Sequence, residues 1–284
     1  MSVKRLGVVG SGVMGAGIAE CAARGGHEVV LRSRRSEAAV AMVAGLERSL
    51  AKRVDQGKMG ADEREAVLSR VRATTDLEDL AECDLVIESI VEDLAAKQHL
   101  FAELDRVVQP RAVLATNTST LAVIELAMAT NRPDRVCGIH FFNPAPVMAV
   151  VEVVRPLTAS DATIMECLEF VTACGKQPVE VKDQAGFIVN ALLFPYLNNA
   201  ARMLDAGGAG KDQIDLAMKG GCGFPMGPLA LLDLVGLDTS VAILEVLHRE
   251  LGDPNYAPVP ILRRMVAAGW LGRKSGRGFY SYRS

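Results

Sequence analysis

A glycine motif near the N-terminus constrains the fold of this chain more than any other feature of its sequence. An apolar run over residues 6–9 leads into GSGVMG at residues 10–15. A helical stretch of small residues follows over residues 16–24, and a second apolar run covers residues 28–31. Strand, glycine loop, helix and strand in this order are typical of a βαβ unit that binds a dinucleotide. A glycine-rich turn in another kind of α/β domain is the alternative interpretation.

Each glycine of the motif has a distinct expected role. Gly10 permits the tight turn, Gly12 lets the backbone approach a pyrophosphate, and Gly15 lets the helix pack close to the strand. The N-terminus of the helix offers free N–H groups and the positive end of its dipole to the phosphates. We therefore predict that the whole loop contacts the cofactor, through Gly10, Ser11, Gly12, Val13, Met14 and Gly15.

The composition excludes several other classes of protein. A net charge of −3 gives no electrostatic reason to expect a nucleic-acid partner. No apolar run approaches the ~20 residues that a membrane span needs, and the first strand begins too early to leave room for a signal peptide. The six cysteines include no CxxC pair, which predicts buried free thiols and no metal site. We therefore expect a cytoplasmic protein that does not bind a membrane.

The order of apolar runs and helical stretches predicts two domains. Up to about residue 182, strands alternate with helices, which is typical of a Rossmann-type α/β fold with a doubly wound, mostly parallel sheet. Two polar helical stretches over residues 36–57 and 61–71 are expected to form a helical hairpin inserted in this domain. We place the boundary so that residues 1–183 form the dinucleotide-binding domain and residues 184–284 form an all-helical domain.

The helical domain is too apolar for a solvated tail. Its apolar stretches at residues 192–194 and 229–237 suggest a buried face between two copies of the chain. The interior of the domain itself is the alternative place for these side chains, and both interpretations stay open at this point.

Polar residues cluster at the end of an apolar strand, in TNTST at residues 116–120. The ends of parallel strands form the crevice in which such sheets bind their ligands. Ser119 is placed to hydrogen-bond an oxygen atom of a substrate there. The alternative is that Ser119 is the N-cap of a helix that begins near residue 121.

A histidine and a glutamate stand in two further apolar strands. His140 ends the strand in GIHFFNP, and histidine has an ordinary pKa of ~6.5, which suits this residue type to move an alcohol proton during hydride transfer. Glu152 lies inside the apolar run VEVV, where a carboxylate is costly without a partner. A neighbouring strand would place Glu152 against the His140 ring, although a core histidine is the alternative. Of the other histidines, His27 stands at a strand start away from the crevice, and His99 and His248 are assigned to the surface or to packing.

A series of motifs along the chain resembles that of the L-3-hydroxyacyl-CoA dehydrogenase family. The motifs are GVVGSGVMG, ATNTST, GIHFFNPAPVM, VEVV, DQAGFIVN, GCGFPMGPLALLDLVGLD and GWLGRKSGRGFY. They occur in order and cover essentially the whole chain. The resemblance implies a Rossmann domain followed by a helical domain that forms a homodimer and part of the substrate pocket. It also implies reversible oxidation of an (S)-3-hydroxyacyl-CoA to the 3-oxoacyl-CoA.

The resemblance assigns roles to residues that match the family motifs. His140 is the general base that takes the hydroxyl proton, and Glu152 orients it. Ser119 and Asn190 hold the substrate oxygen and the thioester end of the substrate. The remaining assignments are Asn117 and Asn143 on the nicotinamide side, Glu92 and Lys97 (in a predicted helix over residues 92–108) at the ribose, and Lys52 at the phosphates of coenzyme A. A solvated surface lysine is the alternative for Lys52.

The end of the second strand departs from the family pattern. The family usually has an acid here, roughly 20 residues after the glycine motif, which receives the ribose hydroxyls of NAD. This chain has Ser33-Arg34-Arg35 instead. A serine donates to a 2′-phosphate and an arginine clamps it, whereas a carboxylate would repel it. We therefore predict NADP(H) as the cofactor in preference to NAD(H), and an exposed basic turn is the alternative interpretation.

Three other functions stay open. A related dehydrogenase that acts on a longer acyl chain, or on one carried by acyl carrier protein, would share every catalytic residue. A relative that oxidises a free hydroxy acid is a further alternative, against which the TNTST motif and the basic hairpin weigh. The non-enzymatic alternative is a cofactor-binding structural or sensor protein, which would not need the pair of His140 and Glu152.

Overall fold

The computed structural model describes residues 3–282 and consists of two compact units. The first, Met1–Gln184, is called the α/β unit here, and the second, Ala185–Ser284, is called the helical unit. The division falls one residue beyond the boundary expected from the sequence. Each unit has its own hydrophobic core.

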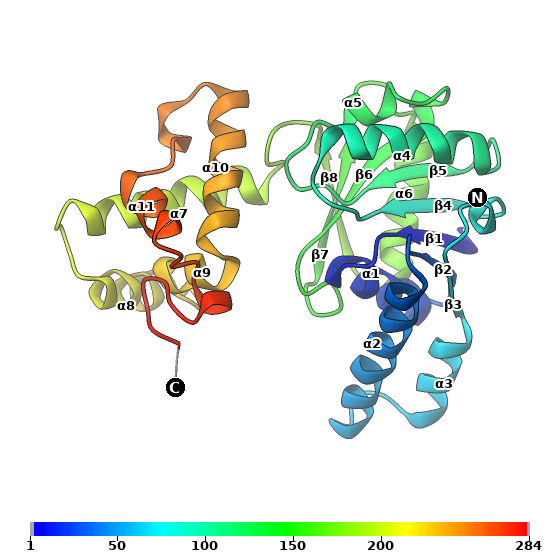
Figure 1. The fold of residues 1–284 in the computed structure, drawn as a ribbon, viewed down its shortest axis with the longest axis horizontal. Helices are drawn as coiled ribbons and strands as arrows, with labels where there is room; N and C mark the ends of the chain where they lie inside the picture. Colours follow the sequence, from blue (N-terminus) through cyan, green and yellow to red (C-terminus); the bar gives the residue numbers. More distant parts are fainter. Residues whose placement is uncertain (1–2, 283–284) are drawn as a thin grey trace. The chain divides into compact units, whose positions relative to one another are not determined.

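One sheet of eight strands forms the centre of the α/β unit (Figure 1). Its strands are β1 (Arg5–Val9), β2 (Glu28–Arg32), β3 (Val71–Thr74), β4 (Leu85–Glu88), β5 (Val113–Thr116), β6 (Val136–Phe141), β7 (Val150–Arg155) and β8 (Gln177–Lys182). Their order across the sheet is β3-β2-β1-β4-β5-β6-β7-β8, and every neighbouring pair is parallel except β6 and β7. This order confirms the Rossmann-type, doubly wound α/β fold, in which the chain changes direction across the sheet between β1 and β4.

The antiparallel pairing of β6 and β7 follows from the length of their connection. Only residues 142–149 separate the two strands. A parallel crossover needs about a dozen residues or more, so β7 returns alongside β6 in the opposite direction. In this register His140 lies directly opposite Glu152.

Helices cover both faces of the sheet (Figure 1). They are α1 (Val13–Arg24), α2 (Ser36–Asp55), α3 (Ala61–Ser69), α4 (Leu94–Val107), α5 (Val123–Ala127) and α6 (Asp161–Ala173). The pair α2 and α3 projects from the sheet beside β3 as the predicted hairpin (Figure 1). Helices α1 and α6 share one core with the strands, in which Leu6, Ile18 and Phe170 are buried.

Two helices begin elsewhere than the sequence predicted. Helix α1 begins at Val13 rather than at residue 16, because the last residues of the glycine motif already form its first turn after Gly12. Helix α4 begins at Leu94 rather than at residue 92, because the side chain of Asp93 accepts a hydrogen bond from the N–H of Ala96 and caps the helix. Glu92 therefore lies in the loop between β4 and α4.

The helical unit consists of α7 (Val189–Asp205), α8 (Lys211–Cys222), α9 (Pro228–Val235), α10 (Leu237–Leu251) and α11 (Pro260–Ala267), with short 3-10 turns at Pro254–Tyr256 and Arg273–Ser275. Two buried aspartates connect its elements. Asp215 of α8 accepts hydrogen bonds from the N–H groups of Leu229 and Ala230 and so caps α9. Asp233 of α9 accepts three hydrogen bonds from residues 279–282 and attaches the C-terminal segment to the helices.

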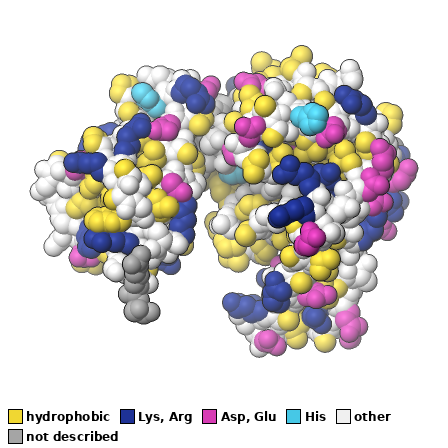
Figure 2. All heavy atoms as spheres, viewed as in Figure 1, with side chains coloured by type: hydrophobic (Ala, Val, Ile, Leu, Met, Phe, Trp, Pro, Cys, Tyr) yellow, Lys and Arg dark blue, Asp and Glu magenta, His cyan; other side chains and the backbone are white. Residues whose placement is uncertain are grey.

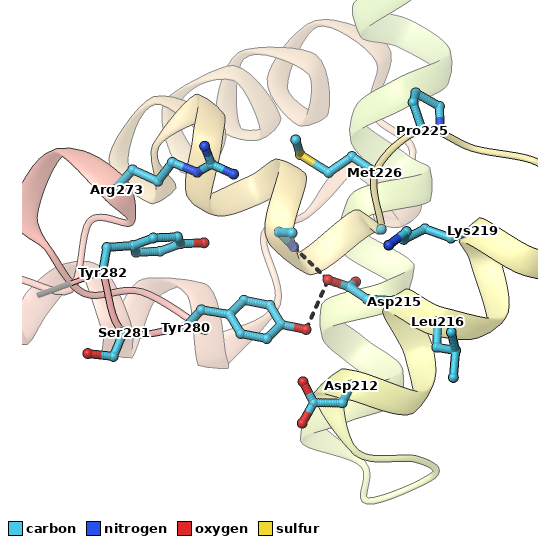
Figure 3. A pocket seen from close by; sticks show the side chains of 12 residues that line it. Asp212, Asp215, Leu216, Lys219, Pro225, Met226, Arg273, Tyr280, Ser281 and Tyr282 are labelled. Carbon is cyan, nitrogen blue, oxygen red and sulfur yellow. Dashed lines mark hydrogen bonds between the residues drawn. The ribbon is translucent and has the colours of Figure 1, made fainter. Parts of the chain in front are cut away.

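A cavity of about 550 Å³ lies in the helical unit between α8 and the C-terminal segment (Figure 3). The hydroxyl of Tyr280 donates a hydrogen bond to Asp215 across its floor, over 3.0 Å. Lys219 lies on the α8 side, and Arg273 lies on the other side against the ring of Tyr282. The buried carboxylate of this cavity is already hydrogen-bonded, and none of the predicted site residues lines it.

Within residues 3–282, no helix is both long enough and apolar enough to cross a membrane. The cysteines are free thiols, and all except Cys222 are buried as predicted. Burial raises the pKa of Cys21 to about 11 and that of Cys83 to about 12. Cys222 differs because it lies at the exposed end of α8. The cytoplasmic location stays a prediction.

A buried ion pair closes the loop after α5 onto the C-terminal end of α4. Arg132 Nε donates to Asp105 Oδ1 over 2.6 Å, and the N–H of Asn131 donates to the same carboxylate. Arg132 also donates to the backbone carbonyls of Asp105 and Gln109. Burial alone would raise the pKa of Asp105, but Asn131 and Arg132 outweigh it and hold this pKa below its ordinary value.

We predict that Asp105→Asn destabilises the α/β unit by about 3 kcal/mol at pH 7, because Arg132 loses its buried counter-charge. The carboxylate stabilises the fold above its unfolded-state pKa, and this contribution disappears as the pH falls through the lowered folded-state pKa. The difference between variant and wild type should therefore shrink below about pH 4. Calorimetry across this pH range measures it, and a constant difference would contradict the assignment.

Candidate active site

The fold itself requires two of the three glycines in the motif. Gly10 has a positive φ of 137°, and a Cβ there would overlap the carbonyl oxygen of Ser89. A Cβ on Gly15 would overlap the carbonyl oxygen of Gly10. These contacts agree with the expected tight turn and close helix packing. Gly12 has open space around it instead, which leaves room for a ligand to approach the backbone of the loop.

A cavity of about 740 Å³ lies next to this loop, at the ends of β1, β2 and β4. Parallel sheets with this strand order bind the pyrophosphate and adenosine of a dinucleotide at such a position. The lining residues are Val9, Gly10, Ser11 and Gly12 after β1, Arg32, Ser33 and Arg34 at the end of β2, Ser89, Ile90 and Val91 after β4, and Ala96, His99, Leu100 and Glu103 of α4. Figure 2 shows Lys and Arg side chains gathered on this face of the α/β unit.

Two cavity residues were missed by the sequence analysis or assigned differently. Arg32 ends β2, and its Nε is buried without a hydrogen-bond partner. An orphaned donor in the wall of a cavity fits a polar or anionic ligand. His99 is exposed as predicted, but it lines the cavity. Its Nε2 lies 3.7 Å from Oε1 of Glu103, which lines the same cavity. The residues present therefore fit a dinucleotide.

The basic turn after β2 places its side chains differently. Ser33 is buried, and its N–H donates to the carbonyl of Thr74. Its Oγ accepts a long hydrogen bond of 3.4 Å from the N–H of Arg35. Arg34 is exposed and lines the cavity, whereas Arg35 is the N-cap residue of α2 and is not among the lining residues. Of the two predicted arginines, only Arg34 is thus placed in the cavity wall.

His140 and Glu152 form the predicted pair. Nδ1 of His140 lies 2.8 Å from Oε2 of Glu152, and both side chains are buried, with 6% and 1% of their residues' surface exposed. Because the carboxylate accepts, it holds the proton on Nδ1 and leaves Nε2 as the basic nitrogen. The ring of Phe142 packs against the imidazole with 4.5 Å between ring centroids. This arrangement has the geometry of a general base oriented by a carboxylate.

Ser119 lies in a loop that a single carboxylate organises. Glu92 accepts hydrogen bonds from the hydroxyls of Thr118 and Thr120 and from the N–H of Ser119. Burial alone would raise the pKa of Glu92, but Lys97 and these loop donors hold it below its ordinary value. The carboxylate therefore stays ionised at neutral pH.

The alternative role of Ser119 as an N-cap is not realised. Helix α5 begins at Val123, two residues beyond the predicted start. Its first N–H groups, those of Val123 and Ile124, donate to the carboxylate of Asp183 over 3.0 and 2.7 Å. The cap thus comes from the end of the α/β unit's chain, and Ser119 has no capping task.

Lys97 is enclosed between two carboxylates. Its Nζ lies 2.6 Å from Glu88 and 3.2 Å from Glu92, and only 1% of its side chain is exposed. Glu88 is fully buried and also accepts hydrogen bonds from Thr116 Oγ1 and the N–H of Ile90. The family resemblance assigns Lys97 to the cofactor ribose, and Glu88 was not among the predicted site residues. The same signal that pointed to Glu152, an acid in an apolar strand, would have found it.

The other predicted residues are spread over the chain. Asn117 follows β5, and its Oδ1 accepts a hydrogen bond from the N–H of Phe141. Asn143 is exposed in the loop after β6, and Lys52 is exposed on α2. Asn190 lies in the first turn of α7, in the helical unit, and is buried. Their contacts with substrate and cofactor stay predictions.

Comparison with known proteins agrees with this site. Residues 5–184 match the model of the 3-hydroxyacyl-CoA dehydrogenase NAD-binding domain, and residues 186–282 match that of the 3-hydroxyacyl-CoA dehydrogenase C-terminal domain. The 3-hydroxybutyryl-CoA dehydrogenase of Mycobacterium tuberculosis is 49% identical over 283 residues, which cover 99% of each chain. That of Clostridioides difficile is 45% identical over 278 residues, 98% of this chain and 99% of the relative.

A solved structure shows the same likeness in three dimensions. The crystal structure of (S)-3-hydroxybutyryl-CoA dehydrogenase from Ralstonia eutropha has a TM-score of 0.97 and 41% identity, with all of both chains covered. The chain therefore belongs to the 3-hydroxyacyl-CoA dehydrogenase family. Residues 5–184 match an NAD-binding domain, which agrees with the glycine loop and its cavity.

We predict that His140→Gln and Glu152→Gln each lower kcat for a 3-hydroxyacyl-CoA by about 10²–10⁴-fold, because they remove the base or the group that orients it. The dissociation constant of the cofactor should stay unchanged, since both residues lie outside the glycine loop and its cavity. Steady-state kinetics and cofactor fluorescence titration measure the two effects. Full turnover in His140→Gln would exclude the assigned base, and retained cofactor binding confirms that the variant is folded.

Proposed function

We propose that the chain is an NADP(H)-preferring 3-hydroxybutyryl-CoA dehydrogenase, which interconverts (S)-3-hydroxybutyryl-CoA and acetoacetyl-CoA. The observation that supports the proposal is the buried pair of His140 and Glu152. His140 lies near the C-terminal end of β6, at the same end of the sheet as the glycine loop that follows β1. Relatives named 3-hydroxybutyryl-CoA dehydrogenase match the full length of the chain and support the choice of substrate. Bound NADP(H) would supply the hydride acceptor or donor for C3 of the substrate.

The chain's own residues would manage the proton and the substrate oxygen. In the oxidative direction, Nε2 of His140 takes the hydroxyl proton while the hydride leaves C3 and the carbonyl forms. Glu152 holds the other ring proton and stabilises the imidazolium that results. Ser119 would hydrogen-bond the substrate oxygen, and Asn190 would hold the thioester end. Lys52, an exposed cation on α2, would face the phosphates of coenzyme A.

The preference for NADP(H) rests on the end of β2. A buried serine, an exposed arginine in the cavity wall and the orphaned Nε of Arg32 stand where an acid would repel a 2′-phosphate. Ser33 and Arg34 are the proposed phosphate ligands, with Arg35 as a second cation beside them. NAD(H) is the alternative cofactor.

We predict that kcat/KM for NADPH exceeds that for NADH in the reduction of acetoacetyl-CoA. The double variant Ser33→Asp/Arg34→Ala should shift the ratio of the two values toward NADH by about 10- to 100-fold, because it removes a charge-assisted contact and adds a repulsive carboxylate. Initial rates with both cofactors over a C4 to C16 acyl-CoA series give the ratio and the chain-length preference together.

A matched control is Arg24→Ala, which removes an exposed arginine from the same βαβ unit outside the cavity. It should leave the cofactor ratio unchanged. A wild-type preference for NADH would refute the proposed cofactor, and activity confined to an acyl group on acyl carrier protein, or to a free hydroxy acid, would refute the proposed substrate.

We also propose that two copies associate through one face of α7. The apolar stretches singled out in the sequence divide between core and surface, since Phe194, Leu229 and Leu232 are buried inside the helical unit while Leu192 is 71% exposed. Leu192 and Tyr196 lie one turn apart on α7.

The ring of Phe224 packs against Tyr196 at the same face, with 5.6 Å between ring centroids. The hydroxyl of Tyr196 is buried without a hydrogen-bond partner. Exposed apolar side chains at Leu192 and Phe224 beside the orphaned hydroxyl of Tyr196 are suited to a surface that a second chain covers.

We predict that Leu192→Asp weakens self-association by about thirtyfold or more, because it introduces a charge into this apolar face. Sedimentation equilibrium over a concentration series measures the dissociation constant. Met165→Asp, at an exposed apolar position of α6 in the α/β unit, is the control and should leave association unchanged. A monomeric wild type, or equal effects of the two variants, would remove this face from consideration.

A further inference from the structure

Glu88 is a fully buried carboxylate that no assigned role accounts for. It is the last residue of β4, and its carboxylate oxygens accept hydrogen bonds from three residues in different parts of the α/β unit. Oε1 accepts from Lys97 Nζ and from the N–H of Ile90, each over 2.6 Å, and Oε2 accepts from Thr116 Oγ1 over 2.8 Å. A carboxylate in such a position is costly unless its partners require it.

Lys97 is the partner that requires it. The ammonium of Lys97 is buried and contacts two carboxylates, at 2.6 Å to Glu88 and 3.2 Å to Glu92. The shorter contact goes to Glu88, which is 0% exposed, and the longer one to Glu92, whose side chain is 39% exposed. Glu88 is thus placed to balance the buried positive charge, and Glu92 remains as the second negative charge of the cluster.

Glu92 connects this cluster to the loop of Ser119. Its Oε1 accepts the hydrogen bonds of Thr118, Ser119 and Thr120, and its Oε2 faces Lys97. The carboxylate therefore divides its acceptor capacity between the loop and the lysine. The strength of the hydrogen bonds from Glu92 to the loop therefore depends on how far Glu88 already balances the charge of Lys97.

We propose that Glu88 and Lys97 are positioning residues for the 118–120 loop. Glu88 balances Lys97, and Lys97 in turn holds Glu92 in its ionised form with Oε1 directed at the loop. Ser119 is thereby presented to the substrate in a fixed position. The kinetic part of the inference rests on the proposed function, in which Ser119 contacts the substrate oxygen.

Because these charges balance one another, we expect loss of the negative charge of Glu88 and loss of the positive charge of Lys97 to disturb the 118–120 loop in the same way. In Glu88→Gln, Lys97 has only Glu92 to balance it, and Glu92 moves from the loop toward the lysine. In Lys97→Met, two neighbouring carboxylates lack a cation, and Glu92 is repelled from its place or binds a proton. In Glu88→Gln/Lys97→Met, both buried charges disappear together, and Glu92 again belongs to the loop alone. A buried ion pair replaced as a unit is tolerated far better than one that is broken.

The experiment is a double-mutant cycle with two readouts. The first is the KM for acetoacetyl-CoA at saturating cofactor, which should rise about tenfold in each single variant through the loss of one well-placed hydrogen bond. In the double variant the KM should return to within about threefold of wild type. The second readout is amide hydrogen exchange of residues 117–121, which should speed up in both single variants and recover in the double variant.

Asp105→Asn is the matched control, because Asp105 is another buried, ion-paired acid of the same unit and lies in none of these contacts. It should lower stability and leave both the KM and the exchange of residues 117–121 unchanged. If the double variant shows the product of the two single effects, or if Glu88→Gln leaves loop exchange at the wild-type rate, Glu88 is a structural residue only and the inference is wrong.

The exchange readout separates this inference from the proposed function. Recovery of loop exchange in the double variant would support the positioning role even if the wild type did not turn over acetoacetyl-CoA, and the proposed substrate alone would then be wrong. Turnover of acetoacetyl-CoA without recovery in the double variant would leave the proposed function standing and overturn the role of Glu88.

Discussion

The antiparallel pairing of β6 and β7 is the constraint on which the candidate active site depends. The connection between the two strands is too short to cross over the sheet, so β7 returns beside β6 and places Glu152 opposite His140. Both side chains are then buried at hydrogen-bond distance. A parallel β7 would have needed a helix in this connection. The orientation of the His140 ring is therefore a result of loop length as much as of residue choice.

Much of the fold follows from patterns that a single sequence displays. Alternating apolar runs and helical stretches predict the doubly wound sheet, and a carboxylate inside VEVV predicts a partner for Glu152 because burial without one is costly. The same reasoning applies to Glu88 at the end of LVIE and would have predicted a buried partner for it. Its partner Lys97 reads as an ordinary polar residue of an amphipathic helix, and only the packing of α4 on the sheet buries it.

Other features are beyond a single sequence for a different reason. Apolar residues have the same spacing on a helix whether they pack against their own core or against another chain. The sequence therefore does not show which leucines of α7 and α9 are buried and which are exposed. The structure buries Phe194 and Leu229 and leaves Leu192 exposed. Likewise, His99 is a surface histidine by pattern, and only the spatial neighbourhood of β2, β4 and α4 shows that it lines the cavity.

The glycine loop separates two kinds of requirement within six residues. Gly10 and Gly15 are demanded by the polypeptide, because any side chain there would meet a backbone carbonyl. A Cβ on Gly12 would meet no atom within 4 Å, so the space beside it is open to a ligand that approaches the loop. In relatives that kept this fold but lost dinucleotide binding, we expect selection to conserve the glycines at positions 10 and 15. Gly12, which the fold itself does not require, would be the first of the three to vary.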